Sequence, residues 1–203
     1  MNSCLTTLYT PNYSNFAPIA IASFEKFCKR YNYNIKVFDD VIDKNLHPSW
    51  NKLLAIKECF KSYDSVFWCD IDSIYLDIDF DFHQINNLHH KNFVTSIDGN
   101  GLCASHLLLR NTEYNNKLID CMLFLGDVKD NNRFNDPDTK WEQNCLKGLL
   151  DHFHIPVDQF LRGTVIEHNA SAFQLNSSFV HYFCMSAEKR TFKMMEMFDS
   201  FYS

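Results

Sequence analysis

The chain has 203 residues, of which 46% are hydrophobic, and its formal net charge of −6 comes with scattered lysines and arginines. This length suits a single domain with one sizeable core, and without a basic stripe to follow a phosphate backbone we expect no nucleic-acid partner. No apolar run approaches the roughly 18 residues of a membrane span, and the N-terminal segment MNSCLTTLYT lacks the features of a signal peptide, so we expect a cytoplasmic or otherwise soluble intracellular protein with no membrane span.

The first third of the chain alternates between strand and helix patterns, in the order strand 3–9, helix 17–31, strand 35–38, helix 50–61 and strand 66–69. A turn at His47, Pro48 and Ser49 supplies the N-cap of the second helix. Parallel strands need crossover connections, which helices commonly provide. The order therefore predicts an α/β fold with a mainly parallel, Rossmann-like sheet flanked by helices.

The second half predicts a less regular series, namely strands 93–97 and 106–110, helix 112–125, a polar loop 126–140, helix 141–152 and a short strand 179–183. The chain finishes in an amphipathic segment that carries Phe192, Met195, Met197 and Phe198. Stripes of this kind usually pack against a core. We see no internal repeat and no linker, so the whole chain is interpreted as one domain.

The eight cysteines stand far apart, without a C-x-x-C pattern, and most lie among apolar residues. Such spacing argues against a zinc site and against a disulfide framework, so we expect reduced thiols in the core. The composition, rich in Asn, Lys and Phe with only 5 Gly, is typical of an AT-rich genome. It suggests a microbial or viral origin.

The apolar strand at 66–69 stops at two aspartates, Asp70 and Asp72. Residues i and i+2 of a strand point the same way, so the two carboxylates should converge. Ligands of parallel sheets bind beyond the carboxyl ends of the strands. Two close carboxylates repel each other or recruit a cation, and oxygen ligands select Mg²⁺ or Mn²⁺. The alternative is that the pair only caps the strand and solvates a turn.

The segment 31–72 resembles the nucleotide-sugar-dependent glycosyltransferases of GT-A fold, especially the family of yeast and plant galactosyl-, mannosyl- and xylosyltransferases. The matching residues are Trp50-x-Lys52 before a helix and Asp70-x-Asp72 after a strand. Looser similarity continues in LLLRNTEYNNKLID, WEQNCLKGLL and FVHYF. One departure is 103–105, Cys-Ala-Ser, where family members commonly show Asn-Ser-Gly. The resemblance implies a nucleotide-binding half, 1–100, and a half for donor sugar and acceptor, 101–203.

The resemblance also implies roles for individual residues. Asp70 and Asp72 would hold a divalent ion on the diphosphate of a sugar nucleotide. His181 would be a further ligand, which favours Mn²⁺ over Mg²⁺ because imidazole suits Mn²⁺ better. Glu142 and Gln143 would face the donor sugar or the acceptor.

Further donor contacts are less specific in the sequence. Lys52 could reach the diphosphate as a point charge, or it could be a solvated helix lysine. Trp50 shares its motif and is a candidate for donor binding, with core packing as the alternative. Tyr9, Thr10 and Tyr13 follow the first strand, where this fold binds the nucleotide base; the tyrosines would stack on uracil or serve turn and core roles.

We therefore predict a metal-dependent glycosyltransferase that uses a UDP-sugar and transfers the sugar to a hydroxyl of a glycan or glycoprotein. An inverting reaction needs a general base, for which Glu142 and Asp98 are candidates, whereas a retaining reaction needs none. A haloacid-dehalogenase-like phosphatase is one alternative, but its nucleophilic Asp follows the first strand of its domain. A non-catalytic nucleotide-sugar or glycan-binding domain is the other alternative.

Overall fold

The computed structural model describes residues 2–76, 91–98, 101–127, 142–152, 154, 158–159, 166–167, 179–182 and 185–202. Its first half contains β1 (Ser3–Leu8), α1 (Ala17–Tyr31), β2 (Asn34–Phe38), α2 (Asn51–Phe60), β3 (Ser65–Cys69) and β4 (Ser73–Tyr75), with short 3-10 helices at Pro11–Tyr13 and Pro48–Trp50. Its second half contains β5 (Phe93–Asp98), β6 (Gly101–Arg110), α4 (Glu113–Asp127), α5 (Glu142–His152), β7 (Asp158–Gln159), β8 (Ile166–Glu167), β9 (Phe179–His181) and α6 (Ala187–Tyr202).

Six strands form the central sheet, in the order β2-β1-β3-β6-β5-β7. Strand β1 pairs in parallel with β2 and β3, and β5 pairs in parallel with β7. Strand β6 is antiparallel to both of its neighbours. All strands of this sheet except β6 therefore run in one direction, which confirms the predicted α/β fold with a mainly parallel sheet.

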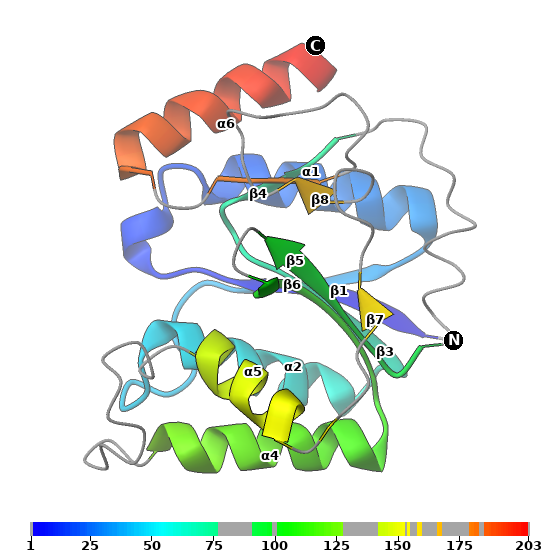
Figure 1. Ribbon diagram of the computed structural model, residues 1–203. Helices are drawn as coiled ribbons and strands as arrows, with labels where there is room; N and C mark the ends of the chain where they lie inside the picture. Colours follow the sequence, from blue (N-terminus) through cyan, green and yellow to red (C-terminus); the bar gives the residue numbers. More distant parts are fainter. Residues whose placement is uncertain are drawn as a thin grey trace.

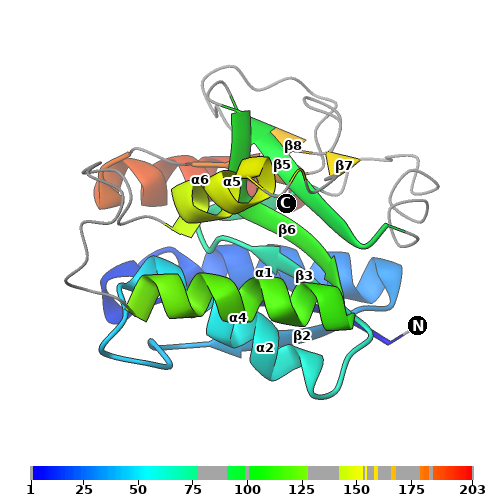
Figure 2. The same ribbon diagram turned by 60° about the horizontal axis from the view of Figure 1, so that its bottom comes forward.

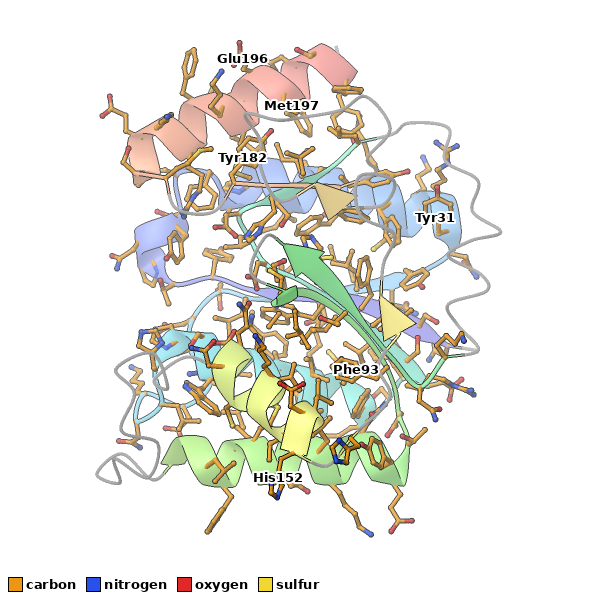
Figure 3. The ribbon with its side chains drawn as sticks, in the orientation of Figure 1. Tyr31, Phe93, His152, Tyr182, Glu196 and Met197 are labelled. Carbon is orange, nitrogen blue, oxygen red and sulfur yellow. The ribbon has the colours of Figure 1, made fainter. Side chains whose placement is uncertain are left out.

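Helices cover both faces of the central sheet (Figure 1). Helices α1 and α6 lie on one side, and α2, α4 and α5 lie on the other, which Figure 2 brings forward. Strand β3 contributes to both cores, because Val66 and Trp68 pack on the side of α2 whereas Phe67 and Cys69 pack on the side of α1. Burial on both faces explains why this strand is an unbroken apolar run. Side chains fill both layers in Figure 3.

A second sheet of three strands, in the order β4-β9-β8, lies on the α1 side of the molecule. The rings of Phe27 and Tyr75 each lie 5.3 Å from that of Phe179, which anchors β9 in the core. Strand β4 is antiparallel to β9, with Ser73 opposite His181. The chain thus turns a corner after β3, where it leaves the central sheet and enters the small one. Asp70 and Asp72 form this corner.

The predicted boundaries agree with the structure for α1 and differ at several other ends. Helix α2 is preceded by a 3-10 turn, and the side chain that caps this turn is His47, which accepts a hydrogen bond from the Ser49 N–H at 3.3 Å. Helix α4 continues to Asp127, so the predicted loop 126–140 begins inside a helix, and its remainder from 128 lies outside the described residues. Strand β6 begins at Gly101 instead of 106, because it forms a long hairpin with β5.

The prediction for the C-terminal stripe was only half right. Met197 and Phe198 pack against the core beneath α6, together with the buried Met194. Phe192 and Met195 are 64% and 50% exposed, because they lie on the outer side of the same helix. Within the described residues, five of the seven cysteines are buried, as expected for core thiols, and all seven are free thiols. No described helix combines the length and the apolar character that crossing a bilayer requires.

Candidate metal and donor site

The corner between β3 and β4 is held by backbone hydrogen bonds on both sides. The Asp70 N–H donates to the Ser105 carbonyl at 2.8 Å, which ties the corner to β6. The Tyr182 N–H donates to the Asp72 carbonyl at 2.8 Å, which ties it to the end of β9. Ile71, between the two aspartates, is buried in the core. The backbone that carries both carboxylates is therefore fixed by its neighbours.

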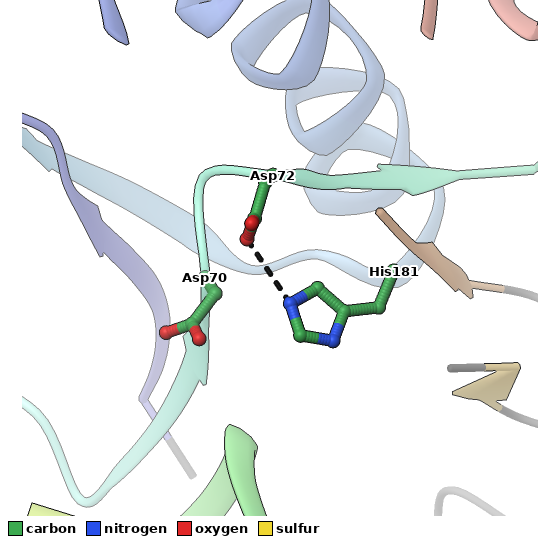
Figure 4. Close-up of side chains that lie close together, drawn as sticks. All are labelled: Asp70, Asp72 and His181. Carbon is green, nitrogen blue, oxygen red and sulfur yellow. Dashed lines mark hydrogen bonds and ion pairs between the residues drawn. The ribbon is translucent and has the colours of Figure 1, made fainter. Parts of the chain in front are cut away.

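Asp70, Asp72 and His181 come together at this corner (Figure 4). One ligand atom from each of the three lies within 4.8 Å of the others, and His181 Nε2 lies 3.1 Å from Asp72 Oδ1. Ligand atoms around one ion at bond lengths of about 2.1 Å are at most about 4 Å apart, so a small inward shift makes this a ligand set. The carboxylates converge as predicted, although they do so across a corner and not along one strand.

Asp72 is the most strongly stabilised carboxylate of the cluster. Burial raises its pKa, but the nearby His181 and the Arg190 guanidinium, whose Nη1 lies 3.5 Å from Asp72 Oδ2, lower the pKa to about 2. For His181, burial lowers the pKa and the partner Asp72 raises it by more, so the net shift is upward. Burial and the adjacent Asp72 raise the pKa of Asp70, while Lys52 acts in the opposite direction. The two aspartates thus have different electrostatic environments.

Lys52 lies on the first turn of α2 and is only 5% exposed, so it is not the solvated helix lysine of the alternative interpretation. Its Nζ is 3.2 Å from Asp70 Oδ1 and 2.8 Å from Glu142 Oε1, and it donates to the Ala104 carbonyl at 2.9 Å. Burial lowers the pKa of Lys52, but the two carboxylates raise it further, so the ammonium is charged. All three of its protons are directed to acceptors within the protein.

A cavity of about 660 Å³ opens over the cluster. It is lined by nine of the candidate metal, donor and catalytic residues from the sequence analysis, namely Tyr9, Thr10, Tyr13, Lys52, Asp70, Asp72, Glu142, Gln143 and His181. Trp50 is placed differently, because it is buried in the core beneath α4, where its ring approaches Gly126. Trp50 is the last residue of the 3-10 turn Pro48–Trp50 and the buried residue of that turn. Asp98 is the last residue of β5, paired with Gly101 where the hairpin turns, and the structure describes its backbone alone.

Several residues at the site were missed by the sequence reasoning. Trp68 donates from its indole Nε1 to Asp70 Oδ1 at 2.7 Å. Its position two residues before Asp70, on the same side of the strand, was a signal that could have found it. His47 and Ser49 line the cavity from the turn before α2. Arg190 reaches Asp72 from α6, and no local pattern marks it.

The sequence matches no protein-family model and no curated protein sequence. Solved structures do match. A glycosyltransferase involved in the glycosylation of the major capsid of PBCV-1 superposes with a TM-score of 0.72 at 15% identity, over 96% of this chain and 100% of that one.

Two further matches extend the comparison. The galactosyltransferase LgtC, solved with donor and acceptor sugar analogues, gives a TM-score of 0.62 at 14% identity, over 98% of this chain and 96% of that one. The glycosyltransferase GlyE of Streptococcus pneumoniae gives a TM-score of 0.57 at 11% identity, over 98% of this chain and 63% of that one. The chain therefore has the GT-A fold that these glycosyltransferases share.

Proposed function

We propose that this protein is a metal-dependent glycosyltransferase that moves a sugar from a nucleoside diphosphate, UDP, to a hydroxyl of a glycan or glycoprotein. One observation carries the proposal: the Asp70, Asp72 and His181 side chains meet at the floor of a large cavity, at the carboxyl end of β3 in a GT-A fold. Fold alone does not fix function, so the site carries the argument. The position of Asp70 after the third strand of the chain disfavours the phosphatase alternative.

The ligand set suits Mn²⁺, with Mg²⁺ as the second choice, because it combines two carboxylates with one imidazole. A divalent ion held by these side chains would stabilise the negative charge that develops on the diphosphate as its bond to the sugar breaks. Asp72 is suited to the ligand role because its pKa of about 2 keeps it ionised at neutral pH. His181 must give up its proton before its Nε2 can bind an ion.

The other residues that line the cavity support separate positions for the nucleotide and for the sugar. We assign the base and ribose to the exit of β1, near Tyr9, Thr10 and Tyr13, where Tyr13 is 37% exposed and its ring can stack on a base. Gln143 Oε1 accepts a hydrogen bond from the Ala104 N–H at 2.9 Å, so its amide nitrogen is the part that can donate to a sugar hydroxyl. In this proposal residues 1–100 bind the nucleotide, and residues 101–203 bind the donor sugar and the acceptor.

In the transfer the bond between the anomeric carbon and the diphosphate oxygen breaks, and a bond from that carbon to the acceptor oxygen forms. The acceptor hydroxyl loses its proton. If the configuration inverts, Glu142 or Asp98 is our candidate for the base that takes it. Glu142 Oε1 is held by Lys52, so Oε2 would accept the proton. If the configuration is retained, the departing diphosphate oxygen would take the proton and no protein base is required; NMR of the product anomer distinguishes the two outcomes.

Calorimetric titration with UDP, with and without Mn²⁺, followed by a screen of sugar nucleotides for hydrolysis, tests the proposal. We expect UDP binding that requires the metal, together with turnover of at least one UDP-sugar. Binding without any turnover would instead indicate a non-catalytic binding domain. Release of phosphate from simple esters without UDP binding would indicate a phosphatase, and either result would overturn the assignment.

A further inference from the structure

The Asp70 carboxylate is held asymmetrically. Trp68 Nε1 donates to Asp70 Oδ1 at 2.7 Å, and Lys52 Nζ lies 3.2 Å from the same oxygen. Two donors therefore converge on Oδ1. A carboxylate held in this way cannot rotate freely about its last side-chain bond, and it presents Oδ2 for any further ligand.

Both donors are themselves fixed by the fold. Trp68 is 3% exposed and packs in the core between β3 and α2. The Lys52 ammonium is also bound by Glu142 Oε1, on the first residue of α5, and by the Ala104 carbonyl on β6. Three acceptors around one ammonium leave it no alternative orientation. The orientation of Asp70 is thus determined by α2, β3, β6 and α5 together.

Joining α2 to α5 would not by itself require Lys52 to contact Asp70. Pairing with Glu142 alone would neutralise the buried ammonium and join α2 to α5. The additional contact to Asp70, and the convergence of the Trp68 indole on the same oxygen, add nothing to that connection. They do, however, control the side chain that lies beside Asp72 and His181.

We propose that Trp68 and Lys52 are positioning residues, which hold Asp70 by Oδ1 so that Oδ2 faces the cation before the donor arrives. Glu142 acts through Lys52. This inference rests on the proposed metal site. Mutation of a group that orients a metal ligand typically weakens metal binding 10- to 100-fold. The reason is that a preorganised ligand does not have to be ordered during binding.

The decisive variant is Trp68→Phe, because it removes the indole N–H without changing any charge. Trp50→Phe is its matched control, since Trp50 is equally buried but lies in the core beneath α4. The measurement is the Mn²⁺ dissociation constant of the full chain without donor, from the EPR signal of unbound Mn²⁺, together with urea unfolding of each variant. We expect Trp68→Phe to bind Mn²⁺ about tenfold more weakly or worse, and Trp50→Phe to bind like wild type although it is less stable.

A second variant keeps the test independent of the Trp68 ring. Lys52→Met combined with Glu142→Gln leaves the net charge unchanged, whereas replacing Lys52 alone would alter the field at the ion. We expect this pair to weaken Mn²⁺ binding at least tenfold as well. If wild-type protein binds Mn²⁺ and Trp68→Phe binds it equally well, this inference is overturned but the proposed function is not. Wild-type protein that takes up no Mn²⁺ would overturn the proposed function, and this inference with it.

Discussion

The Asp72 carboxylate should stabilise the folded chain as well as bind the proposed metal. Its side chain is 16% exposed and lies between the His181 ring, at 3.1 Å, and the Arg190 guanidinium, at 3.5 Å. The fall in its pKa from the ordinary 3.8 to about 2 corresponds to roughly 2 kcal/mol of folding free energy at neutral pH. Asp72→Asn keeps the shape of the side chain and removes the charge, so the variant should lose about that much stability.

The sign of the pH dependence follows from the direction of the shift. Because the pKa of Asp72 is lower in the folded than in the unfolded state, its contribution is present above the ordinary pKa and is lost as the pH falls through about 2. The difference between wild type and Asp72→Asn should therefore be full at pH 7 and pH 5, and reduced to about half at pH 3. Urea unfolding, monitored by tryptophan fluorescence, measures this difference in stability at each pH.

Asp120→Asn is the control for exchanging an acid for its amide. The Asp120 side chain is 55% exposed in a surface ion pair with Lys57, so its loss should change stability by no more than about 0.5 kcal/mol. Asp72→Asn should remain folded at pH 7, where it should show no Mn²⁺-dependent gain in UDP affinity. If Asp72→Asn is as stable as wild type, or if its loss of stability does not depend on pH, the electrostatic reasoning is refuted. Unchanged UDP affinity in Mn²⁺ would refute the ligand role.

Two further predictions concern the core and the imidazole. A methyl group at Gly126 would meet the Trp50 ring at 2.5 Å, so Gly126→Ala should lower the free energy of unfolding in urea by about 1–3 kcal/mol. An added methyl at Gly148 has nothing within 4 Å, so Gly148→Ala should raise the free energy of unfolding by about 0.5–1 kcal/mol. Equal stabilities would contradict the placement of Trp50. NMR titration of the metal-free protein should give His181 a pKa above the ordinary 6.5. The stabilising effect of the charged ring should then fade as the pH rises through the pKa of the folded state. Binding of Mg²⁺ should release a proton from the ring. A pKa below 6.5 would contradict its ion pair with Asp72.

The sequence was sufficient for the parts of the fold that depend on local pattern. The apolar run before Asp70 and the alternation of strands with helices predicted the parallel half of the sheet and the edge at which the site lies. The sequence could not supply the pairing of β4 with β9, which brings His181 to Asp72 across 109 residues. Periodicity within a window of 10 to 20 residues carries no information about such a pairing. The resemblance to a known family proposed His181, and no pattern in this chain did.

The environment of each charged residue was also beyond the sequence. Lys52 occupies a helix position that looks solvated when α2 is considered alone, and it becomes buried only because β6 and α5 close over it. Arg190 lies on a helix whose pattern predicts packing alone, yet it also donates to the Tyr182 and Met185 carbonyls close to Asp72. These roles follow from tertiary contacts, so sequence reasoning can offer the residue types but not their partners.

The contacts made by these two cations bear on what the metal would do. Each aspartate of the corner has its own cation from the protein, because Lys52 lies against Asp70 and Arg190 lies against Asp72. Two neighbouring carboxylates would otherwise repel each other strongly when buried, and an ion would then be needed to complete the fold, as it is in small zinc domains. Since the chain supplies this compensation itself, the corner can form without a metal. The ion would then contribute to donor binding and to charge stabilisation during transfer, and folding would not require it.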